Sequence, residues 1–197
     1  PLVICDPKRY KLPYEPEMVI QCRTNVMTGG GSPVQVGEAL KKLFIVSIVQ
    51  EINEVAEFAD IVFPEPNNWE SLSFWPDEQI QSVGLGYTLY SLVQPVVEPP
   101  FKAPFKVHGA ASIMLELADR AGFLPDVNKL LNVMLELKGP HRLDPSQKYD
   151  FEDISDRRIR SILGEGYSLD WFREHGFLKV ERTVEQAYTR VFHKARV

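Results

Sequence analysis

The stretch FIVSIVQEINEVAEFADIVFP, which runs from Phe44 to Pro64, decides the fold of this chain. Its first six residues are an apolar run of strand length in which Ser47 is polar. Such a run is typical of a strand that is buried on both faces, as in a parallel sheet. The acidic segment 51–58 then has apolar residues at helical spacing, and a second predicted strand, 60–63, is apolar after Asp60 and ends at a proline. Strand, helix and strand in this order predict a parallel sheet with crossover helices.

The residues before this stretch extend the same pattern. Leu2–Cys5 and Met18–Cys22 are short and rich in β-branched residues, and we expect both to be strands. Ser32, Pro33 and Gln35 form a capping box with proline at the first helical position, which predicts a helix from about residue 33 to 43.

The residues after it change in character. Segment 65–104 is rich in proline and aromatic residues and is predicted to be an irregular excursion, whose Trp69, Phe74 and Trp75 we expect to face other domains. Apolar spacing and capping signals then predict several helices, at about residues 113–121, 125–137, 159–163 and 169–175 and from Thr183 onward.

We therefore expect an α/β fold, a three-layer αβα domain with a mainly parallel sheet, followed by a C-terminal helical extension. The predicted division is an α/β domain over residues 1–140 and a helical extension over 141–197.

Composition argues against several classes of function. The chain has 27 acidic residues against 22 Lys and Arg, a net charge of −5, whereas a nucleic-acid or anionic-membrane surface needs a basic face. No apolar run reaches the roughly 18 residues of a membrane span, so we expect neither nucleic-acid binding nor direct membrane insertion. Cys5 and Cys22 lack a Cys-x-x-Cys pair, and the four histidines are scattered, so we expect no metal ligand.

Polar residues follow the predicted strands at their carboxyl ends, where ligands of open α/β sheets bind. They are Arg23, Thr24 and Asn25 after the first strand, Gln50, Glu51 and Asn53 after the second, and Glu65 after the third. A cation, a hydroxyl and an amide can recognise a phosphate, a ribose or a base edge, so we predict these seven residues to be cofactor-binding. The alternative is local structure, with Thr24 and Asn25 organising a turn and the second group capping a helix.

The Gly29–Ser32 segment precedes the capped helix, and a helix N-terminus can hold a phosphate. It matches neither a Walker loop nor a dinucleotide fingerprint, so a plain flexible loop is the alternative interpretation.

Segment 53–64 resembles the pattern T-E-T-A-x-x-A-D-V-V-L-P of the molybdopterin oxidoreductases, with identities at Glu54, Ala56, Ala59, Asp60, Val62 and Pro64. Four further segments resemble the same family, in the order in which the family has them. Residues 23–26 resemble its G-x-N-P turn, with valine in place of the proline, and residues 36–43 resemble V-x-E-A-L-x-K-L. Residues 94–100 resemble Q-P-x-V-E-P-P, and residues 113–122 resemble I-L-x-x-L-A-x-R-x-G.

This resemblance implies that the chain is a fragment of a catalytic large subunit. It would be the third, α/β domain, which grips one pterin guanine dinucleotide of a molybdenum or tungsten bis-molybdopterin guanine dinucleotide cofactor. Arg23 and N–H groups of Gly29–Ser32 would meet the pyrophosphate, and Glu51 or Glu65 the guanine edge. The fragment would hold no catalytic residue, be inactive alone and carry no bound cofactor.

The expected partners are the remaining domains of the same large subunit and an iron–sulfur electron-transfer subunit, and the full-length protein would carry an iron–sulfur cluster. The compartment, cytoplasmic or periplasmic, stays open. Two other hypotheses are a metal-free structural relative in a respiratory complex and a generic α/β nucleotide-binding module.

Overall fold

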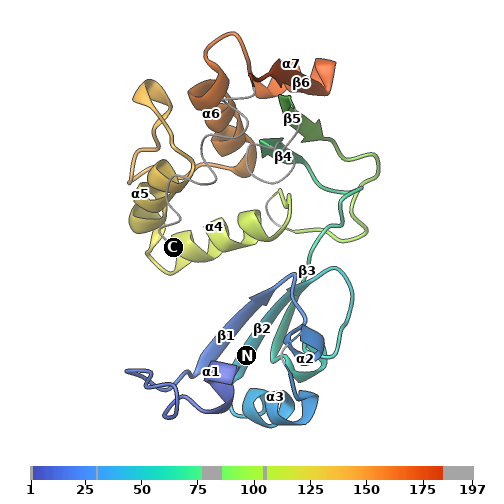
Figure 1. Ribbon diagram of the computed structural model, residues 1–197, viewed down its shortest axis with the longest axis vertical. Coiled ribbons are helices and arrows are strands. Elements are labelled where there is room, and N and C mark those ends of the chain that lie inside the picture. The colour runs from blue at the N-terminus through green and yellow to red at the C-terminus, as the bar shows by residue number, and fades with distance from the viewer. Residues whose placement is uncertain (1, 30, 77–85, 104–105, 184–197) are drawn as a thin grey trace. The chain divides into compact units, whose positions relative to one another are not determined.

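The computed structural model describes residues 2–29, 31–76, 86–103 and 106–183. Its contacts divide the chain into two compact units (Figure 1). The N-terminal unit comprises Pro1–Asn67 and Phe101–Ala103, and the C-terminal unit comprises Asn68–Pro100 and Pro104–Val197. The predicted division into an α/β domain over residues 1–140 and a helical extension over 141–197 stays a prediction.

The N-terminal unit contains the predicted parallel sheet. Its strands are β1 (Met18–Cys22), β2 (Phe44–Val49) and β3 (Ile61–Pro64), in the order β1-β2-β3, and both pairs are parallel. The central strand β2 is buried from Ile45 to Val49, on both of its faces, as its nearly unbroken apolar run predicts. The α/β class and the parallel sheet are therefore confirmed.

Helices pack on this sheet through one apolar cluster. They are α1 (Leu2–Cys5), α2 (Val26–Gly29), α3 (Pro33–Leu40) and the 3₁₀ turn η1 (Ala56–Phe58). Val36 and Leu40 of α3 meet Ile45 of β2 and Val55, which directly precedes η1. Ser32 is the N-cap of α3, because its hydroxyl accepts a hydrogen bond from the N–H of Gln35.

Two predictions for this unit were wrong. Leu2–Cys5 is a helical turn rather than a strand, because Ile4 and Cys5 pack into the α3 cluster and this tertiary contact outweighs the strand preference of the sequence. The helix predicted over 51–58 is reduced to η1, because the Asn53 side chain accepts the N–H groups of Val55 and Ala56 and starts the turn there.

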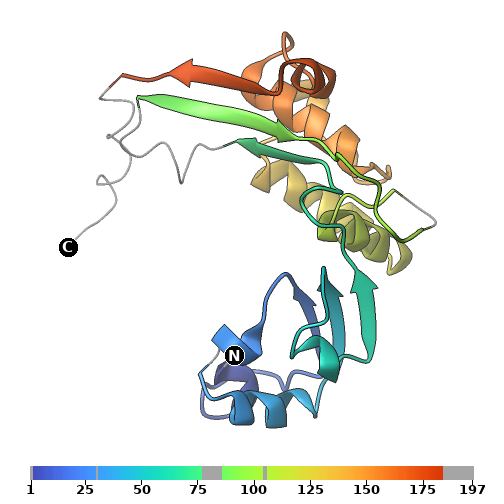
Figure 2. The ribbon, with the colours of Figure 1, turned by 90° about the vertical axis from the view of Figure 1, so that its right-hand side faces the viewer.

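The C-terminal unit contains a second sheet, which corrects the expectation of an irregular excursion over 65–104. Strands β4 (Ser73–Pro76), β5 (Tyr87–Val93) and β6 (Phe177–Glu181) pair antiparallel with β5 in the middle (Figure 2). Burial alternates along β5, and the buried Tyr90 and Leu92 pack against Phe74, Ile159 and Phe172. Trp69 is 69% exposed as expected, whereas Phe74 is buried in this core, and the side chain of Trp75 lies outside the described part.

The predicted helices of the second half are present. They are α4 (Ala110–Arg120), α5 (Leu124–Met134), the 3₁₀ turn η2 (Gly139–His141), α6 (Phe151–Leu163) and α7 (Leu169–His175). Asp150 caps α6, and Ser168 caps α7 as its sequence position predicts. A helix was also expected from Thr183 onward, and apart from Thr183 itself its residues lie outside the part that the structure describes. No helix in the part of the chain that the structure describes is long and apolar enough to cross a membrane.

Candidate functional site

The carboxyl edge of the parallel sheet brings three of the predicted site residues side by side. Arg23, Gln50 and Glu65 each directly follow one of the strands β1, β2 and β3. The N–H of Arg23 donates to the carbonyl of Ile48 at 3.3 Å, and the N–H of Glu65 donates to that of Val49 at 2.9 Å. The hydrogen-bond ladder thus continues one residue beyond the strands, which fixes Arg23 and Glu65 at this edge.

Arg23 and Glu65 form an ion pair across this edge. The Nε of Arg23 lies 2.8 Å from Oε1 of Glu65. The two partners differ sharply in exposure: 45% of the Arg23 side chain is exposed, whereas that of Glu65 is fully buried. Arg23 also has a φ of +50°, in the left-handed region that residues with a Cβ adopt uncommonly.

The charges of this pair act on the neighbouring Cys22. Burial raises the pKa of the Cys22 thiol, Glu65 raises it further, and Arg23 offsets part of the rise. At neutral pH the thiol therefore stays protonated and is not prepared as a nucleophile or as a thiolate ligand.

Asn25 organises the turn after β1. Its side-chain oxygen accepts the N–H of Met27 at 3.2 Å, and its amide donates to Glu54 at 2.5 Å. The backbone N–H of Glu54 and the Asn25 amide both lower the pKa of the Glu54 carboxyl. Asn25 thus ties the loop after β1 to the loop after β2. This is the structural role, organising a turn, that the sequence offered as the alternative to ligand binding. The neighbouring Thr24 is exposed.

The loop after β2 contains the other predicted residues. Gln50 donates from its amide to the carbonyl of Pro66 at 3.4 Å, which links the loops after β2 and β3. Asn53 caps η1 through its side-chain oxygen. Glu51 is exposed between them and makes no hydrogen bond to the residues that the structure describes. Its carboxylate is therefore open to a ligand.

The predicted anion cradle before α3 offers few donors. Pro33 has no N–H, the N–H of Gln35 is directed to the Ser32 hydroxyl at 3.5 Å, and the N–H of Val36 donates to the Ser32 carbonyl. Capping thus uses most of the groups that an anion would need. Arg23 is consequently the main anion-binding group that we identify at this edge.

The arrangement has the chemistry of a binding surface. Arg23 supplies a cation, Thr24 a hydroxyl and Glu51 a carboxylate, all exposed at one edge of the sheet. In the described ranges, no three His, Cys, Asp or Glu side chains come together in a group that could hold a metal ion. The edge can thus bind an anionic ligand with hydrogen-bonding groups, and it offers no metal centre within those ranges.

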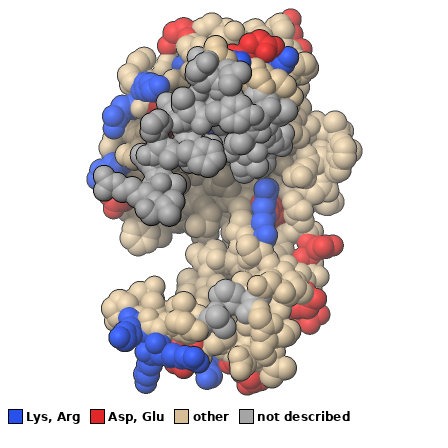
Figure 3. All heavy atoms as spheres, viewed as in Figure 1, with Lys and Arg blue, Asp and Glu red and all other residues tan. Residues whose placement is uncertain are grey.

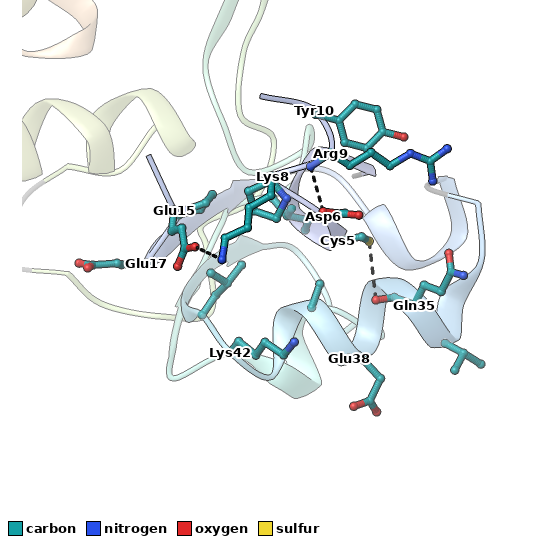
Figure 4. Close-up of a pocket in the computed structure, with 16 residues that line it drawn as sticks. Cys5, Asp6, Lys8, Arg9, Tyr10, Glu15, Glu17, Gln35, Glu38 and Lys42 are labelled. Carbon is teal, nitrogen blue, oxygen red and sulfur yellow. Dashed lines mark hydrogen bonds and ion pairs between the residues drawn. The ribbon is translucent and has the colours of Figure 1, made fainter. Parts of the chain in front are cut away.

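The N-terminal unit also has a hollow of about 830 Å³, which lies elsewhere (Figure 4). Lys8, Arg9 and Lys42 line it, and Lys and Arg side chains gather over the loop between α1 and β1 (Figure 3). Its lining includes Glu17 and Leu43, which directly precede β1 and β2. The hollow therefore reaches the amino ends of the strands, whereas ligands of parallel sheets bind at the carboxyl ends.

Sequence reasoning missed several polar residues that shape the edge. Gln21 and Ser47 are buried in the sheet and are joined by a hydrogen bond of 3.4 Å, just before the strands end. Glu54, which holds Asn25, was treated as part of a motif only. A polar residue within each apolar strand was the available signal for the first pair, because the register aligns Gln21 with Ser47.

Comparison with known proteins supplies a likeness of fold. No model of a known protein family matches the chain, and no curated protein matches it. Among solved structures, the chain is similar to acetylene hydratase from Pelobacter acetylenicus, with a TM-score of 0.58 and 17% sequence identity. The match covers 92% of this chain and 21% of that enzyme, so the chain spans about a fifth of its length. At this identity the likeness concerns the fold.

Proposed function

We propose that this chain is the α/β domain of a molybdopterin-dependent oxidoreductase and supplies the surface that binds one pterin guanine dinucleotide of a molybdenum or tungsten cofactor. Two separate observations support this. Five segments of the sequence resemble that family in the family's order, and the fold resembles a part of a solved enzyme, acetylene hydratase. Because the match uses a fifth of that enzyme, the activity is proposed for the full-length protein and not for this chain alone.

The observation that carries the proposal is the meeting of Arg23, Gln50 and Glu65 at the carboxyl edge of the parallel sheet. Nucleotides bind at this edge of open α/β sheets, because the loops that leave the strands there can surround a ligand. Polar residues from three separate segments converge on it, and an exposed cation is among them.

The residues present fit the nucleotide end of the cofactor. The half-exposed guanidinium of Arg23 suits a pyrophosphate oxygen. The open carboxylate of Glu51 suits the paired N–H donors of a guanine edge, and the exposed hydroxyl of Thr24 suits a ribose or phosphate oxygen. When bound, the cofactor would supply the redox chemistry of its metal, and this chain would bind and orient one end of it.

The proposed partners follow from this role. The other domains of the same large subunit would complete the pocket, and an iron–sulfur electron-transfer subunit would exchange electrons with the metal. One edge of one sheet surrounds only part of a dinucleotide, so the isolated chain should bind it weakly.

The test is the variant Arg23→Ala in the full-length protein, with molybdenum, tungsten and pterin measured per chain. We expect lower cofactor occupancy, because the pyrophosphate would lose a charge-assisted hydrogen bond. Arg120→Ala is the matched control, since Arg120 is also an arginine paired with a glutamate, Glu116, but on the surface of α4.

Cofactor content that is unchanged in Arg23→Ala and equal to that of the control would show that the nucleotide does not use this edge. Full-length wild-type protein that contains neither metal nor pterin would favour the metal-free structural relative instead.

A further inference from the structure

We propose that Glu65 is a positioning residue, and that it holds Arg23 as a receptor for an oxyanion of the phosphate type. The inference is argued from the geometry of Arg23 and Glu65. It rests on the proposed function in one respect, which is that the natural ligand is the pyrophosphate of a dinucleotide.

The ion pair uses the Nε–H of the Arg23 guanidinium and does not use its two terminal nitrogens. Glu65 accepts a hydrogen bond from Nε of Arg23. The terminal nitrogens, Nη1 and Nη2, make no hydrogen bond to the residues that the structure describes, and nearly half of the side chain is exposed. Two parallel N–H donors on a planar group match two oxygens of a phosphate, which is the geometry that distinguishes arginine from lysine.

Glu65 is held more firmly than a partner in a surface ion pair. Its side chain is fully buried, and its backbone N–H is bonded to the carbonyl of Val49. A buried carboxylate needs charged or hydrogen-bonded partners, and the ion pair with Arg23 supplies one of them. Arg23 is therefore kept in one position before any ligand arrives, which reduces the ordering cost of binding.

The backbone of Arg23 is fixed at the same place. Its φ of +50° lies in the left-handed region, and its N–H is bonded to the carbonyl of Ile48. Non-glycine residues in this region persist where the surrounding structure determines them, and they cluster at ligand-binding sites.

The pairing also restricts the ligand. Glu65 cancels part of the charge of Arg23, so a small monovalent anion gains little by binding there. A ligand that accepts from both terminal nitrogens still gains two charge-assisted hydrogen bonds. The site should thus prefer pyrophosphate or phosphate to chloride.

The experiment is calorimetric titration of inorganic pyrophosphate into the 197-residue chain at constant ionic strength, in wild type, Arg23→Lys, Glu65→Gln and the double variant. Arg23→Lys keeps the charge and loses the fork, and we expect pyrophosphate to bind about tenfold more weakly, the loss typical of one charge-assisted hydrogen bond. Glu65→Gln should weaken binding several-fold when residue 23 is arginine and have little effect when it is lysine.

The double variant separates positioning from a general structural role. Equal losses from Glu65→Gln in both backgrounds would overturn the proposal, and so would wild-type affinity in Arg23→Lys or an absence of pyrophosphate binding in the wild type. If Glu65→Gln does not fold, as judged by circular dichroism, the Arg23→Lys measurement decides alone. Pyrophosphate binding that depends on Arg23, in a full-length protein that lacks pterin, would uphold this inference and refute the proposed function.

Discussion

Glu152 is the centre of an ion-pair network that we expect to stabilise the C-terminal unit. Its carboxylate contacts Lys106, the Nε2 of His108 at 3.0 Å and the Nη2 of Arg173 at 2.5 Å. The side chain is 19% exposed, so this network joins the segment before α4 to α6 and α7 in a largely buried place. The perturbation is Glu152→Gln, which keeps the shape and removes the charge.

The magnitude follows from the pKa of Glu152. Burial alone would raise this pKa, but hydrogen bonds from Lys106 and Arg173 outweigh it and hold the pKa at about 2, against an ordinary value of 4.5. A pKa that is lower in the folded state stabilises the fold above the ordinary pKa, and this stabilisation is lost as the pH falls toward the folded value. A difference of about 2.5 between the two pKa values corresponds to at most about 3–4 kcal/mol, and solvent screening reduces it to about 1–2 kcal/mol.

The assay is urea unfolding followed by tryptophan fluorescence, because Trp69, Trp75 and Trp171 all belong to the C-terminal unit. At pH 7 the variant should be less stable than the wild type by about 1–2 kcal/mol, and the gap should shrink between pH 4.5 and 2. Asp126→Asn is the control, since Asp126 is a highly exposed partner of Lys129 and should have little effect. A gap of the same size at pH 3 and pH 7, or no gap at pH 7, would refute the reasoning.

Three further substitutions test the core of the C-terminal unit and two side-chain caps. Phe172→Ala should lower the free energy of unfolding by about 3–5 kcal/mol, because Phe172 is fully buried and packs edge-on against Phe74 and Trp171. Phe172→Leu should lower it clearly less, and equal losses of stability in the two variants would argue against this core. Ser168→Ala should cost about 1 kcal/mol through loss of the α7 cap, and Ser168→Asp should retain most of it, both measured by urea unfolding. Asn53→Ala should cost a similar amount, about 1 kcal/mol, because two N–H groups lose their acceptor, and an unchanged unfolding midpoint would contradict that role for Asn53.

Local sequence signals predicted the N-terminal sheet well. The bounds of β1 and β2 match the predicted strands, and the Ser32 cap of α3 is present. These features depend on short-range patterns, since an apolar run sets the burial of a strand and a single hydroxyl starts a helix. Leu2–Cys5 failed because its conformation depends on packing against α3, which is distant in the sequence.

The second sheet required information that no local pattern supplies. β6 pairs with β5 across more than eighty residues of sequence, and both β4 and β5 lie within the proline-rich segment. The alternation of β5 was an available signal that the surrounding prolines obscured. The ion pairs of Glu152 likewise have no local signal, because its partners Lys106 and Arg173 come from other segments.

For the candidate site, topology predicted which residues come together, but not how they pair. The rule for carboxyl ends places Arg23, Gln50 and Glu65 at one edge. The burial of Glu65 against Arg23 depends on backbone geometry. The same holds for the side chain of Asn25, which bonds to Met27 and Glu54, and for that of Asn53, which caps η1. The role of these residues in cofactor binding stays a prediction.

The most direct test of the central claim is the pterin and guanine nucleotide content of the purified full-length protein. Pterin is quantified by fluorescence after oxidation, GMP after acid hydrolysis, and molybdenum and tungsten by mass spectrometry. The proposal predicts pterin and GMP in equal amounts, together with one of the two metals. Pure, folded full-length protein that releases neither pterin nor GMP would contradict it.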